Sequence, residues 1–289
     1  MTNPRPVTQL DKTEVLSGLF ASWDALDRLL DGLPEPRWRT PAPLPGWDVR
    51  AVVSHIIGTE STLLGIATPE ADVDVTALEH VRNDVGATNE RWVRHLSGEP
   101  GAVLHERLRA VTDERRQALT KLPDDDWGGL TPTAAGPDSY GRLMRVRVFD
   151  CWMHEQDIRA AIGLPASDAE LVGPASRLAL DEMAAVMGFV VGKLGQAPDG
   201  SRVAIELTGP LARTIRVVVD RLGRVVDDFG GLGVPPACGG TPTATIRMDG
   251  LQFTRMAGGR ADATGAGGVD LGGDQEVAAR IVEHLDYVI

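Results

Sequence analysis

Apolar residues recur at helical spacing through about the first 195 positions of this 289-residue chain, and the pattern then changes to strand-like alternation. The clearest helical stripe lies in residues 11–32, where leucines recur at intervals of three and four residues. The loop Gly195–Gly200 separates the two patterns. We therefore expect an α+β protein, with a helical domain over residues 1–197 and a small, mostly antiparallel α+β domain over residues 198–289.

Proline, glycine and capping residues mark the expected ends of the elements. Pro34 and Pro36 terminate the first helix, and Asp48 is a candidate N-cap for the second. The expected helices cover residues 11–32, 48–65, 76–97, 101–121, 139–162, 168–195, 249–257 and 274–286. The expected strands cover residues 203–208, 215–220, 224–228 and 243–248.

The pattern with the most chemical content lies in the helix expected over residues 139–162. Asp150 and His154 are four residues apart, so they project from one helix face about one turn apart. Asp157 shares that face and could orient His154. A weak surface pair gives the same spacing, but apolar neighbours such as Trp152 indicate a buried helix. Ionisable side chains in a buried helix need a partner, which favours a metal site.

A second histidine, His55, lies among core-facing positions of another amphipathic stretch, beside Val52 and Ile56. This position suits either a core histidine or a metal ligand. Two histidines and one carboxylate from facing helices would leave one coordination position open, as catalytic metal sites do. The other histidines have charged or polar neighbours and give no comparable signal: His80, His95, His105 and His284.

Two other side chains near the motif have simpler interpretations. Arg147 lies three residues before Asp150 and could pair with a carboxylate on the same face. Cys151 is rotated by about 100° from Asp150, so we expect a buried, inert thiol rather than a ligand. Cys151 and Cys238 are far apart and neither belongs to a CxxC pair, which argues against a disulfide framework.

Charge and hydropathy exclude several classes of partner. The formal net charge of -12 and the sequence pI near 5.0 argue against nucleic acid or an anionic membrane. No stretch of 18 uninterrupted apolar residues predicts a transmembrane helix, and the N-terminus has no secretory signal pattern. We therefore expect a cytoplasmic protein, either monomeric or homodimeric, that acts on small molecules.

Taken together, these segments resemble the mycothiol-dependent maleylpyruvate isomerase family. The resemblance rests on Pro45–His55 (PGWDVRAVVSH), on Arg147–Ile158 (RVFDCWMHEQDI) and on a tail, residues 248–263, similar to the small domain that follows the bundle in many members. It implies a DinB-like, metal-binding, up-down four-helix bundle followed by a sterol-carrier-like α/β domain. Arginine far outnumbers lysine here, which is consistent with actinobacteria, where mycothiol is the main small thiol.

The resemblance also implies a ligand set and a chemistry. His55, Asp150 and His154 match the ligands of a divalent metal, with Zn²⁺ as the first expectation. The family usually has glutamate where this chain has Asp150; aspartate is one methylene shorter, so the metal must shift, the helices must approach, or affinity falls. Mycothiol would be activated as a thiolate for S-transfer to, or isomerisation of, a small electrophile.

Binding of the sugar-thiol needs polar groups beyond the metal ligands. Arg82, Asn83 and Asn89, on the third expected helix, are candidates, and Arg260 or Arg216 could contribute from the second domain. Two non-catalytic functions remain open. The chain could be a small-molecule binding protein whose metal is structural or absent, or a regulatory partner, since similar bundles are reused as anti-sigma proteins.

Overall fold

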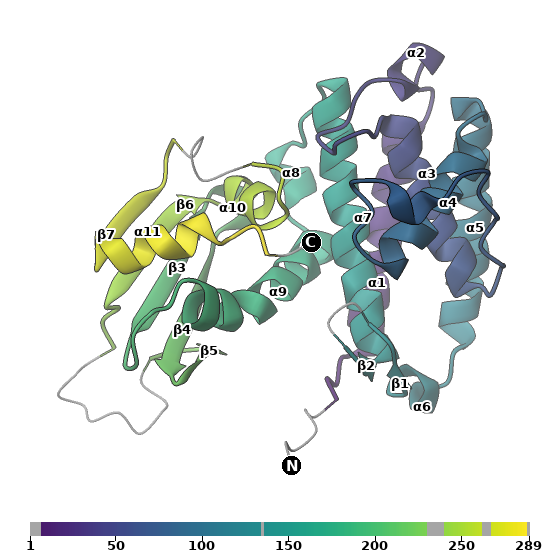
Figure 1. Ribbon diagram of the computed structural model, residues 1–289. Helices are drawn as coiled ribbons and strands as arrows, with labels where there is room; N and C mark the ends of the chain where they lie inside the picture. The colour runs from purple at the N-terminus through teal and green to yellow at the C-terminus, as the bar shows by residue number, and fades with distance from the viewer. Residues whose placement is uncertain (1–6, 134–135, 230–239, 262–266, 288–289) are drawn as a thin grey trace. The chain divides into compact units, whose positions relative to one another are not determined.

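The computed structural model describes residues 7–133, 136–229, 240–261 and 267–287 (Figure 1). Contacts between residues divide the chain into two compact units, Met1–Ala166 and Ser167–Ile289. The first unit is helical apart from one short hairpin, and the second contains a sheet with helices packed against it. The expected α+β class, with a helical N-terminal part and a C-terminal sheet, is confirmed.

Four long helices form a bundle in the described part of the first unit. They are α1 (Lys12–Leu30), α3 (Val49–Leu63), α5 (Gly101–Lys121) and α7 (Tyr140–Ile162). Helices α5 and α7 each pack against both α1 and α3, so α1 and α3 lie diagonally across the bundle. The four long helices expected in this part therefore form, with bounds that differ by a few residues at most.

The helix directions follow from contacts at the two ends of the bundle. Beyond α1, the short helix α2 (Glu35–Trp38) approaches α5, where the Gly101 amide donates a 2.8 Å hydrogen bond to Glu35. At the opposite end Thr8, before α1, donates a 2.7 Å hydrogen bond from its amide to Asp138, before α7. Helices α1 and α7 therefore run one way, and α3 and α5 run the other. The order is up, down, down, up rather than strict alternation.

The short helix α4 (Asp84–Leu96) explains this order, because it leads the chain back along α3 before α5 begins. It starts later than expected, after a 3₁₀ turn at Val75–Ala77. Two further short elements close the far end of the bundle: α6 (Asp124–Trp127) and the hairpin of β1 (Leu130–Thr131) and β2 (Asp138–Ser139).

The bundle core is apolar along most of its length. Helix α1 buries Leu19, Trp23 and Leu26, and α7 buries Val148 and Trp152 against it. The outward faces of the helices are polar, as expected for amphipathic helices. None of the helices in the described residues is both long enough and apolar enough to cross a membrane.

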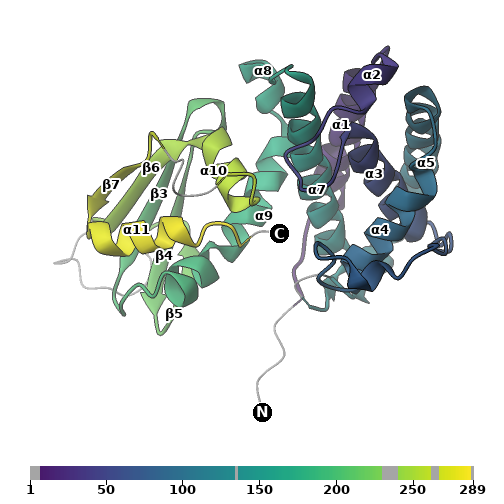
Figure 2. The ribbon, with the colours of Figure 1, turned by 45° about the horizontal axis from the view of Figure 1, so that its top comes forward.

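The second unit contains, among its described residues, a five-stranded sheet in the order β5-β4-β3-β6-β7 (Figure 2). Strands β3 and β6 pair in parallel, and the other neighbours pair antiparallel. The helices α9, α10 and α11 pack against the sheet.

The strands are β3 (Arg202–Thr208), β4 (Arg213–Asp220), β5 (Leu222–Val226), β6 (Ala244–Asp249) and β7 (Asp270–Gly273). The helices are α8 (Asp168–Leu171), α9 (Pro174–Phe189), α10 (Gly250–Ala257) and α11 (Gln275–Glu283), with a π-helical turn at Val190–Leu194 and a 3₁₀ turn at Gly209–Leu211.

Two elements of this unit differ from the sequence expectation. The single helix expected over residues 168–195 is divided into α8 and α9, because Pro174 lacks a backbone N–H and starts a new helix. Strand β7 was not expected, because its sequence Asp-Leu-Gly-Gly has neither alternation nor β-branched residues.

The division between the units lies at residues 166 and 167, whereas the sequence places it at residues 197 and 198. Helix α9 belongs with the sheet because it packs against β4 and β5. Glycines permit this approach: a Cβ at Gly223 of β5 would overlap the backbone carbonyl of Gly188 in α9. Helical periodicity identifies α9 as a helix but does not show which core its apolar face joins.

Gly58 provides a test of helix packing in the bundle. A Cβ at this position would overlap the Cβ and Cγ of Trp92 on α4, atoms too close to the backbone to move aside. We expect Gly58→Ala to lower the free energy of unfolding by about 1–3 kcal/mol, although helix propensity alone favours alanine by about 1 kcal/mol. Urea denaturation measures the change. Gly98→Ala is the control, because its new Cβ has nothing within 4 Å; equal stabilities of the two variants would contradict the α3–α4 packing.

Candidate metal centre

Helices α3 and α7 bring His55, Asp150 and His154 together in the bundle. Each helix has a defined start: the Asp48 side chain accepts the Ala51 amide at 2.9 Å, and the Ser139 hydroxyl accepts the Arg142 amide at 3.0 Å. The helix starts and the packing of α3 on α7 place one donor atom from each of the three residues within 4.8 Å of one another.

The distances within this triad suit a metal ion. Oδ1 of Asp150 lies 3.4 Å from Nε2 of His55 and 3.6 Å from Nε2 of His154. Zinc bonds of about 2.0–2.2 Å in a tetrahedron set neighbouring ligand atoms about 3.3–3.5 Å apart. The two distances from Oδ1 of Asp150 to the imidazole nitrogens therefore match that spacing closely. The donor set of two imidazoles and one carboxylate suits a divalent transition metal.

The three side chains of the triad differ in how far they are buried. The side chains of His55 and His154 are only 6% and 7% exposed, whereas that of Asp150 is 26% exposed. The histidines are therefore shielded by the bundle, and the carboxylate is the most exposed member of the triad.

Asp157 fixes the orientation of the His154 ring. Its Oδ2 lies 3.0 Å from Nδ1 of His154, and its side chain is buried. With Nδ1 engaged, Nε2 is directed at Asp150. Such a carboxylate behind a ligand histidine sets the tautomer and orientation of the ring. The geometry therefore supports the role expected for Asp157.

His55 is held differently. Its Nε2 lies 3.2 Å from Oδ2 of Asp150, and its Nδ1 is buried without a hydrogen-bond partner among the described residues. Burial lowers the pKa of His55, although the nearby Asp150 carboxylate favours the charged ring. The neutral imidazole is the form that binds a metal.

Asp150 is held as a carboxylate by its neighbours. Burial alone would raise its pKa, but the positive charge of Arg147, with contributions from both imidazoles, lowers the pKa of Asp150 well below its usual range. Arg147 donates a 2.6 Å hydrogen bond from Nη1 to Oδ2 of Asp150. The expected pairing of Arg147 with a carboxylate on its own helix face is thus present.

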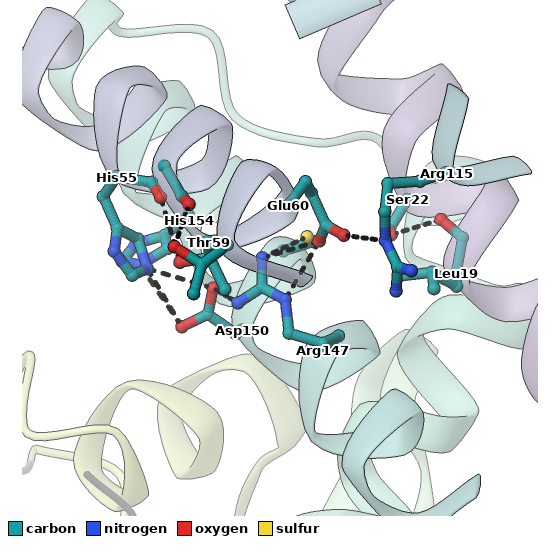
Figure 3. Close-up of polar contacts among 12 residues, drawn as sticks. Leu19, Ser22, His55, Thr59, Glu60, Arg115, Arg147, Asp150 and His154 are labelled. Carbon is teal, nitrogen blue, oxygen red and sulfur yellow. Dashed lines mark hydrogen bonds and ion pairs between the residues drawn. The ribbon is translucent and has the colours of Figure 1, made fainter. Parts of the chain in front are cut away.

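Glu60 is a site residue that sequence reasoning missed. It lies on α3 five residues after His55, and its side chain is fully buried between Arg147 and Arg115 (Figure 3). The apolar surroundings of this single glutamate were the available signal. Its partners lie 55 and 87 residues away along the chain, so no local spacing could identify them.

Trp47 covers the metal centre from the loop before α3. The centroid of its ring lies 5.4 Å from that of His55 and 6.2 Å from that of His154. The same side chain lines a groove of about 670 Å³ formed by the loop Pro41–Asp48, the first turns of α3 and the end of α4. The sequence motif includes Trp47, but its spacing alone assigned it no role.

The candidates for thiol binding have other contacts. The Asn83 side chain caps α4 by accepting the Gly86 amide at 2.9 Å, and the preceding Arg82 is exposed. Within the second unit, Arg260 donates to the Gly258 carbonyl and lines a pocket of about 900 Å³. None of these three is part of the metal triad, so their role stays a prediction. Cys238 lies outside the described residues.

Family models match both parts of the chain. The model of the mycothiol maleylpyruvate isomerase N-terminal domain matches residues 19–159, and that of the MDMPI C-terminal domain matches residues 177–280. The chain belongs to the mycothiol-dependent maleylpyruvate isomerase family. The resemblance found in the two sequence motifs and the tail is confirmed, and the candidate metal triad lies at those motifs.

The chain is also similar to individual proteins of known sequence or structure. Uncharacterised proteins from two strains of Mycobacterium tuberculosis are each 25% identical over 214 residues, which cover 71% of this chain and 76% of theirs. A crystal structure of the mycothiol-dependent maleylpyruvate isomerase superposes with a TM-score of 0.57 at 17% identity, over 91% of this chain and 93% of that one. The crystal structure of a histidine-to-alanine mutant of that enzyme superposes with a TM-score of 0.56. These structures show a shared fold.

Cys151 should be unreactive while the protein is folded. It is fully buried, and burial raises the pKa of its thiol to about 12 despite the nearby charge of Arg147. In a Cys238→Ser variant, we expect no reaction with a chromogenic disulfide reagent at about pH 8 and complete reaction in denaturant. Rapid labelling of the native protein would contradict the buried position.

Proposed function

We propose that this chain is a divalent-metal-dependent thiol enzyme of the cytoplasm. His55, Asp150 and His154 hold the metal, with zinc as the first candidate. The thiol is mycothiol or a similar small thiol, and the reaction is S-transfer to, or isomerisation of, a small electrophile. The observation that carries the proposal is the triad itself, two histidines and one carboxylate at ligand spacing with one side open.

Each residue of the triad has a task that its surroundings support. Burial keeps His55 neutral, Asp157 directs Nε2 of His154 inward, and Arg147 keeps Asp150 ionised. A divalent cation bound there supplies Lewis acidity that favours the thiolate form of a thiol near neutral pH. Two neutral imidazoles and one carboxylate leave that cation with a net positive charge, which suits an anionic sulfur.

The opening at Asp150 is where the thiol and the electrophile would meet. In an isomerisation, the substrate double bond accepts the sulfur at one carbon and a proton at the other, rotates as a single bond, and reforms when both leave. In an S-transfer, the electrophilic carbon keeps the sulfur and releases its leaving group. Trp47 covers both imidazoles and limits the access of water from its side.

A second candidate function is a non-catalytic small-molecule binding protein. The groove beside Trp47 favours it, because its walls are mainly the proline-rich loop and apolar side chains such as Val93. In this case the metal is structural or absent. An apolar ligand that co-purifies with the protein and stays bound after metal removal would favour this function over the enzyme.

Metal content tests the first step of the proposal. We expect about one zinc or similar divalent ion per untagged chain, and its loss in His154→Ala, because that change removes one of three ligands. Elemental analysis measures both. A wild-type protein that holds no metal, even after zinc is offered, would contradict the proposal and leave the binding protein as the leading candidate.

Thiol binding tests the second step. Metal-loaded protein should bind mycothiol or an analogue such as its cysteinyl glucosamine core, and the metal-free protein should bind it much more weakly. With cobalt in place of zinc, coordination by sulfur adds an intense near-ultraviolet band that titrates with the thiol. The absence of binding at roughly millimolar thiol would exclude thiol chemistry at this metal.

A further inference from the structure

Glu60 is the most deeply buried carboxylate beside the metal centre, yet it is too far along α3 to join the triad. Its side chain has no exposed surface. A buried carboxylate without partners is strongly unfavourable, and both oxygens of Glu60 are in fact paired. Oε2 accepts a 3.0 Å hydrogen bond from Nε of Arg115, and Oε1 accepts one of 3.0 Å from Nε of Arg147.

Arg147 uses different edges of its guanidinium for its two carboxylate partners. Nε and Nη2 both lie 3.0 Å from Oε1 of Glu60, while Nη1 is 2.6 Å from Oδ2 of Asp150 (Figure 3). A planar, five-donor group can contact two carboxylates at once in fixed directions, which an ammonium cannot do. The orientation of Asp150 is therefore set from α3, through Glu60, as well as by its own helix.

This contact gives the two oxygens of Asp150 different surroundings. Oδ2 accepts the hydrogen bond from Arg147 and lies 3.2 Å from Nε2 of His55, whereas Oδ1 lies 3.4 and 3.6 Å from the imidazole nitrogens of His55 and His154. Oδ1, which lies near both imidazole nitrogens, would be the oxygen that holds a cation. The short aspartate side chain has little freedom once one oxygen is held.

A purely structural role explains this arrangement poorly. Buried ion pairs are often no more stabilising than apolar residues of similar size, and the bundle core around them is otherwise apolar. Arg115 is also buried, and its remaining donors reach the Tyr140 hydroxyl at 3.2–3.3 Å. Arg115, Glu60, Arg147 and Asp150 therefore form one continuous series of charged contacts that ends at the triad.

We propose that Glu60 and Arg147 are positioning residues that hold the carboxylate of Asp150 in place for a divalent cation. This inference rests on the proposed metal-dependent function. The formal charges of Glu60, Arg115, Arg147 and Asp150 cancel. Removal of the Glu60 charge releases the guanidinium and also leaves an excess positive charge beside the cation, so both effects weaken metal binding.

The test is the affinity of the full-length protein for Zn²⁺, measured by competition with a chromophoric chelator. We expect Glu60→Gln to bind zinc roughly 10- to 100-fold more weakly than wild type, the usual effect of losing an outer-shell contact. Arg147→Lys keeps the charge but cannot contact both carboxylates, so it should weaken binding by a similar factor. Because the two residues act in series, the double variant should be little worse than either single one.

Glu90→Gln is the matched control. Glu90 is also a buried glutamate with a basic partner, Arg94 at 2.8 Å, but it lies on α4 outside the triad. The Glu90→Gln variant should have a lower free energy of unfolding than wild type but the same affinity for zinc. The visible spectrum of the cobalt-loaded protein gives a second readout, because altered coordination by Asp150 changes its bands, whereas a loss of core stability alone does not.

The outcomes separate this inference from the proposed function. Wild-type zinc affinity and an unchanged cobalt spectrum in both Glu60→Gln and Arg147→Lys would overturn the positioning role while leaving the metal site intact. If Glu60→Gln does not fold, the zinc affinity and cobalt spectrum of Arg147→Lys alone test the positioning role. A wild-type protein without metal affinity would instead overturn the proposed function itself, and with it this inference.

Discussion

One guanidinium connects the two sides of the site, and the geometry of the triad depends on it. Arg147 extends from α7 to a buried glutamate on α3 and, one turn along its own helix, to the carboxylate of Asp150. The same contact lowers the pKa of Asp150 and holds one of its oxygens by a hydrogen bond. Histidine side chains from both helices approach the same carboxylate.

The apolar packing of the bundle makes this polar layer possible. Large side chains such as Trp23 and Trp152 fill the core around it, and close contacts at glycines bring helices together where a side chain would not fit. In a dry surrounding, charged hydrogen bonds are strong, and unpaired charges are costly. A layer of this kind is therefore well ordered only when every charged member has a partner, as Glu60 does twice.

The extent to which the sequence predicted this protein varies with the range of the interaction. The long helices and four of the strands were predictable, because periodicity and capping residues such as Asp48 act within a few residues. Strand β7 was not predictable, because its glycines give no strand signal and the strand forms through its pairing with β6. The place of α9 beside the sheet was also missed, because an apolar stripe does not identify its partner.

The same distinction applies to the metal centre. The common helix face of Asp150, His154 and Asp157 follows from their spacing, because residues three and four apart on a helix are neighbours in any fold. The contact of His55 with Asp150 and the enclosure of Glu60 by two arginines depend instead on how the helices pack. Those contacts join residues 55 to 95 positions apart, and they exist because α3 packs against both α5 and α7.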